Sequence, residues 1–218
     1  MDPLEHALNE LPVTVRWHFA RLSTPPNWSL LPAEELALVD KAVPHRRVEF
    51  AWGRICARRA LRDCGIAPGL LLAENRCPTW PKGASASITH GAGYAIAIAA
   101  PAADHSGLGI DIEEASPLKP ELLPYICTDA EQQMLAGPDL GRLAKLVFSA
   151  KECAYKAQYR RSRTFMDFHE MSVRLDLSTA TFQARFTMGV PFFPKGSTIT
   201  GRFWDVDGRW LTFAALKP

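Results

Sequence analysis

The sequence has few of the features that mark secreted, membrane-spanning or zinc-stabilised chains. Its five cysteines form an odd number and include no CxxC pair, which argues against a disulfide framework and against a cysteine zinc site. The longest apolar stretch, residues 94–103, is about 10 residues long and too short to cross a bilayer. The first residues also lack the basic-then-apolar layout of a signal peptide. We therefore expect a cytoplasmic protein with reduced thiols and no membrane partner.

The chain also lacks a strong excess of charge of either sign. Its formal net charge is +2, so composition gives no reason to expect nucleic acid as a partner. With 218 residues, 47% hydrophobic and 22% charged, it is typical of a globular protein with one large domain or two small lobes. We find no internal repeat and no low-complexity segment. We expect a monomer in which any anion site comes from local clustering of basic residues.

Apolar spacing predicts an α+β fold with two similar halves. Prolines interrupt the first 45 residues and predict short strands and turns there, whereas residues 44–64 and 143–159 have helical spacing. Thr128 and Glu131 predict a capping box at the start of another helix. Strands are predicted at residues 85–90, 93–100, 108–113, 172–177, 181–187, 198–204 and 210–216. We therefore predict two lobes, 1–106 and 107–218, each a small antiparallel sheet packed by a long helix, with the ligand in the cleft between them.

Two acids are spaced two residues apart in the segment Gly109-Ile110-Asp111-Ile112-Glu113. On a strand, residues i and i+2 point to the same face, so Asp111 and Glu113 project together. Two carboxylates at this separation repel each other unless a cation lies between them, and Mg²⁺ prefers such oxygen ligands. Considered alone, however, the pair fits an exposed strand end with solvated acids better than a metal site.

A second set of polar residues lies in the predicted helix at 143–159. Glu152 and Lys156 are separated by four residues and share a helix face, with Ser149 one turn earlier. Such a spacing commonly reflects a surface ion pair of about 0.3–0.5 kcal/mol. The functional interpretation is that Glu152 supplies a third metal carboxylate or a general base while Lys156 neutralises phosphate charge.

Basic residues gather on the helix predicted after Pro44, where six arginines occur within 17 positions, 46–62. Arg47, Arg54 and Arg58 fall nearly on one line, while Arg46 lies about 80° from Arg54. Most of these side chains fit a solvated face, but arginine also suits bidentate phosphate binding, so one or two could contact a ligand. His90, at a predicted strand end beside a glycine turn, is either a phosphate contact or a structural histidine.

Four blocks then occur in a specific order along the chain. They are Arg46-Arg47-x-Glu49-Phe50-x-x-Gly53-Arg54, Trp80-Pro81-x-Gly83 with Ser87-Ile88-Thr89-His90, Gly109 to Glu113, and Phe148-Ser149-x-Lys151-Glu152-x-x-x-Lys156. Together they closely resemble the 4′-phosphopantetheinyl transferase superfamily, and within it the enterobactin-type branch of the Sfp group. The resemblance covers about residues 46 to 156. Ala86 departs from the glycine often found there, and which residue supplies the family's basic side chain near residues 75–76 is left open.

The resemblance implies two similar lobes with coenzyme A bound in the cleft between them. It implies transfer of the 4′-phosphopantetheine arm to a serine of a carrier protein, with Mg²⁺ required and adenosine 3′,5′-bisphosphate released. The partners implied are acyl or peptidyl carrier domains of fatty-acid, polyketide or nonribosomal-peptide synthases, including those that make siderophores.

The resemblance also assigns residues. Metal binding falls to Asp111, Glu113 and Glu152, helped by the Ile112 carbonyl, and the reaction itself to Glu152 as base with Lys156 and His90. Coenzyme A contacts are expected from Arg46, Arg54, Asn75, Arg76, Thr89, His90, Lys151 and Lys156, with Met166 beside the pantetheine arm and Arg47 as a competitor of Arg46. We expect Thr89 and His90 at the 3′-phosphate or pyrophosphate, and both lysines at the pyrophosphate.

Two other functions use the same residues. A Mg²⁺-dependent nucleotide phosphatase or nucleotidyltransferase would need the acids but not the arginine helix. A module that only binds a nucleotide or a carrier protein would gain nothing from clustered carboxylates. For the transferase we add a docking hypothesis: Arg160, Arg161 and Arg163 with the apolar loop 118–125 receive the acidic carrier protein.

Overall fold

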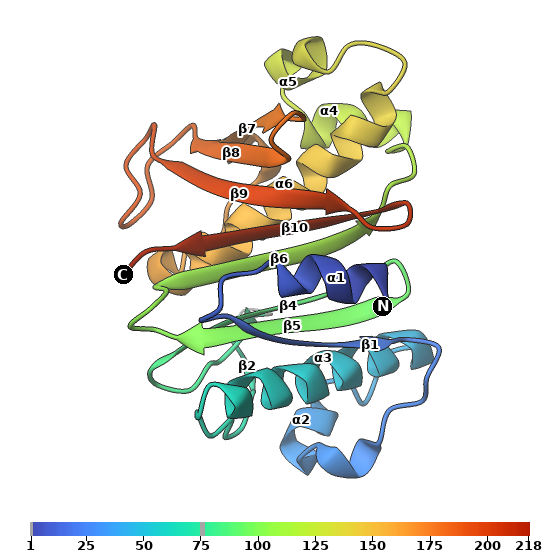
Figure 1. Ribbon diagram of the computed structural model, residues 1–218, viewed down its shortest axis with the longest axis vertical. Helices are drawn as coiled ribbons and strands as arrows, with labels where there is room; N and C mark the ends of the chain where they lie inside the picture. Colours follow the sequence, from blue (N-terminus) through green and yellow to red (C-terminus); the bar gives the residue numbers. More distant parts are fainter. Residues whose placement is uncertain (1, 75–76) are drawn as a thin grey trace.

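Two main antiparallel sheets lie side by side, each with a long helix, in the computed structural model of the chain, which also has a two-stranded sheet of β2 and β3 (Figure 1). The structure describes residues 2–74 and 77–218, so the expected ligand contacts Asn75 and Arg76 lie outside the described residues. The first half contains α1 (Pro3–Asn9), β1 (Arg16–Arg21), η1 (Trp28–Leu30), α2 (Ala33–Ala37), α3 (Pro44–Asp63), β2 (Ala73–Glu74), β3 (Cys77–Pro78), β4 (Ala84–Gly91) and β5 (Tyr94–Pro101). Its main sheet has the order β1-β5-β4.

The second half carries the larger sheet, in the order β6-β10-β9-β8-β7. Its elements are β6 (Gly107–Glu114), η2 (Pro120–Leu122), α4 (Leu123–Ile126), α5 (Asp129–Met134), α6 (Leu140–Ser162), η3 (Phe168–Glu170), β7 (Met171–Asp176), β8 (Thr181–Phe186), β9 (Thr198–Asp205) and β10 (Arg209–Leu216). The prediction of two antiparallel sheets, each with a long helix, is confirmed. The exact lobe boundary at residues 106 and 107 stays a prediction.

Strand β5 shows why its sequence is so rich in alanine and isoleucine. Its alternate residues face opposite sides of the sheet. Ala97 and Ala99 belong to the core under α3, where small side chains let the helix approach closely. Ile96 and Ile98 belong to the core that contains Leu8 of α1. The strand is therefore buried on both faces, as its apolar run predicts.

The helix α1 was not predicted, because the prolines near the N-terminus indicated only strands and turns. Asp2 caps it by accepting a hydrogen bond from the Leu4 backbone N–H over 3.0 Å, and Pro3 occupies the first turn, where its missing N–H costs nothing. Leu4 and Leu8 are buried in the core that also contains Ile110 of β6. The helix thus packs across the junction between the two sheets (Figure 1).

Helix α6 packs unusually close to β6 because Gly109 has no side chain. A Cβ atom placed on Gly109 would lie 2.0 Å from the Cys153 carbonyl oxygen. That separation is far below any real contact, so only glycine allows this helix-to-strand distance. The close approach brings Glu152, on the helix, toward Asp111, on the strand.

Strands β4 and β6, one from each sheet, are connected through side-chain hydroxyls. The backbone N–H of Ile110 donates to Ser87 Oγ over 3.3 Å. That of Ile112 donates to Thr89 Oγ1 over the same distance, 3.3 Å. The two hydroxyls take the place of backbone carbonyls as acceptors where the sheets diverge.

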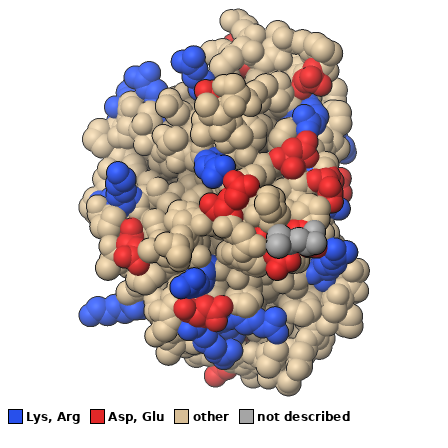
Figure 2. Space-filling model, in the orientation of Figure 1, with Lys and Arg blue, Asp and Glu red and all other residues tan. Residues whose placement is uncertain are grey.

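The charge distribution on the surface and the state of the cysteines agree with what the composition predicts. Figure 2 shows basic and acidic side chains interspersed over one face, with no broad region of one sign. No helix in the part of the chain that the structure describes is long and apolar enough to cross a membrane. All five cysteines are free thiols, and three of them, Cys56, Cys127 and Cys153, are buried.

Candidate active site

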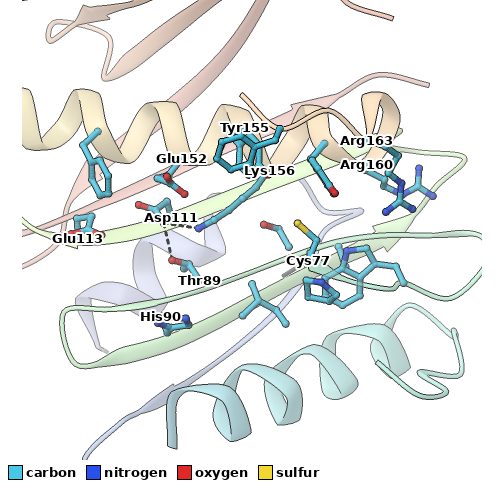
Figure 3. Close-up of a pocket in the computed structure, with 18 residues that line it drawn as sticks. Cys77, Thr89, His90, Asp111, Glu113, Glu152, Tyr155, Lys156, Arg160 and Arg163 are labelled. Atoms are coloured by element: carbon cyan, nitrogen blue, oxygen red, sulfur yellow. Dashed lines mark hydrogen bonds and ion pairs between the residues drawn. The ribbon is translucent and has the colours of Figure 1, made fainter. Parts of the chain in front are cut away.

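A cleft of about 720 Å³ lies where β4, β6 and α6 meet, so both halves of the chain contribute to its walls. Asp111 and Glu113 of β6 and Glu152 of α6 lie toward one end of the view in Figure 3, and Arg160 and Arg163 lie toward the other. Seven residues that we expected in the site line this cleft or its immediate edge: Thr89, His90, Asp111, Glu113, Glu152, Lys156 and, next to His90, Arg46.

Asp111 is the most firmly held acid in the cleft. Its Oδ1 accepts hydrogen bonds from Thr89 Oγ1 at 2.9 Å and from Lys156 Nζ at 2.6 Å. Its Oδ2 accepts one from Ser149 Oγ at 2.9 Å, and Asp111 is only 4% exposed. Three such donors hold the carboxylate at one fixed orientation. Ser149, which we noted only by its helical spacing, therefore orients the expected metal ligand.

Glu113 and Glu152 face the same cleft but are held less tightly. Glu113 accepts one bond from Lys145 Nζ over 3.3 Å, and no described residue forms a hydrogen bond or ion pair with Glu152. Burial and the nearby charge of Asp111 raise the pKa of the Glu113 carboxyl. Burial also raises the pKa of Glu152. The charge of Lys156 opposes this rise, and the charge of Asp111 adds to it. The three acids are thus close enough to affect one another.

These acids fit a hard divalent cation in chemical type, because carboxylate oxygens are the ligands that Mg²⁺ prefers. A cation would offset the burial and the charge of Asp111 that together raise the pKa of both glutamates. Within residues 2–74 and 77–218, however, no three histidine, cysteine or acidic side chains already lie close enough together to hold a metal ion. Lys156 contacts Asp111 instead, and its ammonium carries the positive charge beside that carboxylate.

The backbone at Ile112 is closely covered by the turn between β4 and β5. A Cβ atom on Gly91 would lie 2.6 Å from the Ile112 carbonyl oxygen. Within the predicted turn at 90–93, residues 92 and 93 form the turn, whereas His90 and Gly91 end β4, and glycine is required at position 91 for close approach. The Ile112 carbonyl therefore faces this glycine at the junction of the two sheets.

Lys156 reaches from α6 to the backbone and side chain of β6. Besides Asp111, its ammonium donates to the Ile110 carbonyl oxygen over 3.1 Å. Burial alone would lower the pKa of Lys156, but the charges of Asp111 and Glu152 outweigh burial and raise it. The side chain is therefore a permanent cation on the cleft wall.

The structure distinguishes Arg46 from Arg47. Arg46 donates to the ring of His90 and pairs with Glu49 over 3.2 Å, whereas the Arg47 guanidinium lies 5.7 Å from the centre of the Trp28 ring. Burial, helped by the charge of Arg46, lowers the pKa of His90. His90 is therefore neutral near pH 7, with Arg46 as the adjacent cation. Of the two arginines, Arg46 is therefore the one that lies at the cleft edge, where it could contact a ligand.

Arg54 is a buried cation without a carboxylate partner among the described residues. Its side chain is 5% exposed, lies 4.6 Å from the centre of the Phe50 ring, and leaves its buried Nε without a hydrogen bond. Burial and the neighbouring Arg58 and Arg46 lower the pKa of Arg54 to about 10. A buried guanidinium in this state would be stabilised by an anion.

Lys151 and Met166 lie outside the main cleft. The Lys151 ammonium is 2% exposed and donates to Ile126 O, Glu131 Oε2 and Phe168 O, so our expectation that it faces the pyrophosphate is corrected. Helical geometry explains the difference, since residue 151 lies about 100° from Glu152 and about 140° from Lys156 around the helix axis. Met166 lines a smaller adjoining pocket of about 160 Å³, together with Glu152, Tyr155 and Phe165.

Several cleft residues were not among those we singled out from the sequence. Tyr155 precedes Lys156 on α6, and Cys77 lines the opposite wall with Trp80, which belongs to the second sequence block. Burial raises the pKa of the Cys77 thiol, so it is not poised as a nucleophile. A helical wheel would have placed Tyr155 beside Glu152, since the two are three residues apart. Nothing in the sequence alone could have placed Cys77 opposite them.

Comparisons with known proteins agree with this geometry. Residues 34–100 match the family described as 4′-phosphopantetheinyl transferase N-terminal domain, and residues 107–208 match the 4′-phosphopantetheinyl transferase superfamily. The chain is 42% identical to 4′-phosphopantetheinyl transferase Svp of Streptomyces mobaraensis, over 86% of this chain and 76% of Svp. It is 31% identical to the transferase PptT of Mycobacterium tuberculosis, over 86% and 83% of the two chains.

A further relative supports the enterobactin-type branch. The chain is 34% identical to enterobactin synthase component D of Escherichia coli K12, over 66% of this chain and 70% of the relative. The order of the sequence blocks, the shared cleft and these relatives agree with one another. The chain belongs to the 4′-phosphopantetheinyl transferase superfamily and is a transferase of that type.

Proposed function

We propose that this enzyme transfers the 4′-phosphopantetheine arm of coenzyme A to a serine of an acyl or peptidyl carrier protein, with Mg²⁺ required. The serine oxygen forms a bond to the phosphorus that carries the pantetheine. The bond between that phosphorus and the bridging oxygen breaks, and adenosine 3′,5′-bisphosphate leaves. The observation that carries the proposal is the cleft in which Asp111, Glu152 and Lys156 meet Thr89 and His90 of the other half.

The nucleotide end of coenzyme A is proposed to lie beside His90 and Arg46. Arg46 is the exposed cation at this edge of the cleft, and the buried guanidinium of Arg54 offers charge from the same helix, α3. Both suit phosphate groups, because guanidinium donors match phosphate oxygens in pairs. We propose that Thr89 and His90 contact the 3′-phosphate or the pyrophosphate.

The leaving phosphate gains negative charge as the bond breaks, and Lys156 is placed to offset it. Its ammonium is held by Asp111 and by the Ile110 carbonyl on the cleft wall, so it is oriented before substrate binds. Oriented charges of this kind stabilise a transition state more than mobile ones do. Asp111, Glu113 and Glu152, with the Ile112 carbonyl, would hold Mg²⁺, which when bound would supply charge neutralisation at the pyrophosphate.

Glu152 is our proposed general base for the serine proton. No described side chain occupies its carboxylate, and burial raises its pKa toward the range in which a carboxylate accepts a proton effectively. Asp111 is less suited to this role, because three donors already bind its oxygens. We therefore propose that the carrier serine approaches Glu152.

The pantetheine arm is proposed to extend from the cleft into the adjoining pocket lined by Tyr155, Phe165 and Met166. This pocket shares Glu152, Tyr155 and Phe165 with the main cleft, so a ligand can enter one from the other. Aromatic and methionine side chains make up much of its wall, and they suit the methyl and methylene groups of the arm.

The two parts of our docking hypothesis lie at opposite ends of α6. Leu118 donates its backbone N–H to Gly141 O at the first turn, whereas Arg160 and Arg161 lie in the last turn and Arg163 is the C-cap. The helix has 23 residues and a length of about 34 Å. Arg160 is also engaged with Ala84 O and Ser106 O, at 3.0 and 2.9 Å. We therefore propose that Arg161 and Arg163 form the electrostatic part of the docking surface.

We propose that the enzyme acts in the cytoplasm, to which its free thiols are suited. The test of the function is mass spectrometry of an apo carrier protein incubated with coenzyme A, Mg²⁺ and the enzyme. A gain of one phosphopantetheine supports the proposal. Hydrolysis of the nucleotide without that gain would instead favour the alternative of a Mg²⁺-dependent phosphatase or nucleotidyltransferase.

A further inference from the structure

Lys151 is a buried cation whose hydrogen-bonding capacity is fully used within the protein. Its ammonium donates to Ile126 O at 2.7 Å, to Glu131 Oε2 at 2.8 Å and to Phe168 O at 2.9 Å. A lysine ammonium has three hydrogens, and each has an acceptor here. The side chain therefore cannot contact a phosphate without giving up one of these bonds.

Its partner Glu131 is equally committed. Oε2 of Glu131 also accepts the Thr128 backbone N–H at 2.7 Å, which closes the predicted capping box of α5. Oε1 accepts the Val173 backbone N–H of β7 at 2.6 Å. The Lys151–Glu131 pair thus joins α6 to the end of α4, the start of α5, η3 and β7.

One of these bonds defines the wall of the adjoining pocket. That pocket lies between α6, which contributes Lys151, Glu152 and Tyr155, and the segment 165–171. Phe168, in the middle of that segment, is held to α6 through its carbonyl oxygen by Lys151. The ring of Phe168 also packs against Phe148 of the main cleft, with centroids 5.5 Å apart. The width of the pocket beside Glu152 therefore depends on Lys151.

A buried ion pair contributes little net stability compared with an apolar pair of similar volume, because desolvation of the two charges offsets their attraction. What the charged pair does provide is directionality, since each bond fixes a specific backbone group. Removing Lys151 alone leaves the buried carboxylate of Glu131 without its partner and lowers stability, so an effect on the pocket is seen in the ratio of two ligand affinities and not in the free energy of unfolding.

We propose that Lys151 is a positioning residue for the pantetheine arm: by holding the Phe168 carbonyl, it sets the pocket beside Glu152 at the width that the arm requires. The inference rests on the proposed function, and within it Lys151 acts through the segment 165–171 rather than through the pyrophosphate. Coenzyme A would then lose affinity without Lys151, whereas a nucleotide that lacks the arm would not.

The experiment compares two ligands by calorimetry in the presence of Mg²⁺: coenzyme A, and adenosine 3′-phosphate 5′-diphosphate, which keeps the phosphates but has no arm. For Lys151→Met we expect coenzyme A to bind about tenfold more weakly or worse, with the second ligand changed less than about threefold. Phe182→Leu serves as the control. Phe182 is fully buried in the core of the larger sheet and lines neither the main cleft nor the adjoining pocket. It should lower stability and leave the ratio of the two affinities unchanged.

Equal weakening of both ligands in Lys151→Met, or no weakening of either, would overturn the proposal. If that variant does not fold, Lys151→Gln decides, because a neutral amide cannot donate to all three acceptors of the ammonium, and the same selective loss is expected. A higher KM for the carrier protein with unchanged coenzyme A affinity would also overturn it, since the pocket would then receive the carrier. Failure of the proposed function would be seen separately, as a wild-type enzyme that adds no phosphopantetheine to the carrier.

Discussion

The hydroxyl of Thr89 donates a hydrogen bond to Oδ1 of Asp111 over 2.9 Å, and the two residues belong to different sheets. The same hydroxyl accepts the backbone N–H of Ile112 over 3.3 Å. One side chain therefore both joins the two halves and orients an acid of the active site. The relative position of the halves and the chemistry of the cleft are linked at this residue.

Thr89→Val keeps the shape of the side chain and removes both hydrogen bonds. We expect it to lower the free energy of unfolding by about 1–3 kcal/mol and to lower kcat/KM by about tenfold or more. Ser87→Ala is the matched control, since Ser87 accepts the Ile110 N–H in the same way but does not contact Asp111. Chemical denaturation and steady-state kinetics of both variants check this. Equal losses of activity in Thr89→Val and Ser87→Ala would contradict this, because they would show that activity depends on the contact between β4 and β6 and not on the orientation of Asp111.

Gly109→Ala should be strongly destabilising, because the new methyl group would meet the Cys153 carbonyl at 2.0 Å. Helix α6 would have to move away from β6, and Glu152 would move with it. We expect a loss of about 2 kcal/mol or more in stability and little remaining transfer. Gly189→Ala is the control, since its nearest neighbour would be 3.4 Å away. A Gly109→Ala enzyme as stable and active as wild type would contradict the close packing.

His90 should make folding stability depend on pH. Burial and Arg46 lower its pKa from the usual 6.5, so the folded protein binds the proton less readily than the unfolded chain. The stability is therefore full above the unfolded pKa and falls as the pH decreases below it. Between about pH 7.5 and about pH 5.5, wild type should lose up to about 1 kcal/mol more than His90→Asn. Thermal denaturation at both pH values tests this, with the exposed His169→Asn as control, and parallel losses in wild type and His90→Asn would refute it.

Arg161→Glu should weaken binding of the carrier protein while leaving coenzyme A largely unaffected. Arg161 lies over the Phe192 ring, 5.1 Å from its centre, and does not line the cleft. Charge reversal at a docking surface should raise the carrier KM by about tenfold at low salt and by less at high salt. Tyr125→Ser is the comparison, at a residue that is 71% exposed in the segment 118–125, which begins near the other end of α6. A higher carrier KM only in Tyr125→Ser would place docking at that end instead.

Much of the fold and site could be predicted because it follows from local periodicity. The i, i+2 spacing predicts that Asp111 and Glu113 share a strand face, and both line the cleft. The i, i+4 spacing predicts that Glu152 and Lys156 share a helix face, and both line it too. The same periodicity, applied to Lys151, would have turned it away from the cleft.

What could not be predicted depends on contacts between distant segments. Helix α1 forms where its apolar residues pack on the junction of the sheets, and no local signal outweighed the prolines around it. The three donors to Asp111 come from β4 and two turns of α6, which only the folded chain brings together. Whether Arg46 or Arg47 faces the cleft likewise depended on where Trp28 and His90 lie.

The most direct test of the account concerns Glu152, the acid that no described side chain occupies. Glu152→Ala should abolish transfer of phosphopantetheine to an apo carrier protein, as followed by mass spectrometry. The same variant should bind coenzyme A within about tenfold of wild type, a difference of about 1.4 kcal/mol. We expect an enzyme that binds its donor and leaves the carrier unmodified. A Glu152→Ala enzyme that still modifies the carrier at the wild-type rate would contradict it.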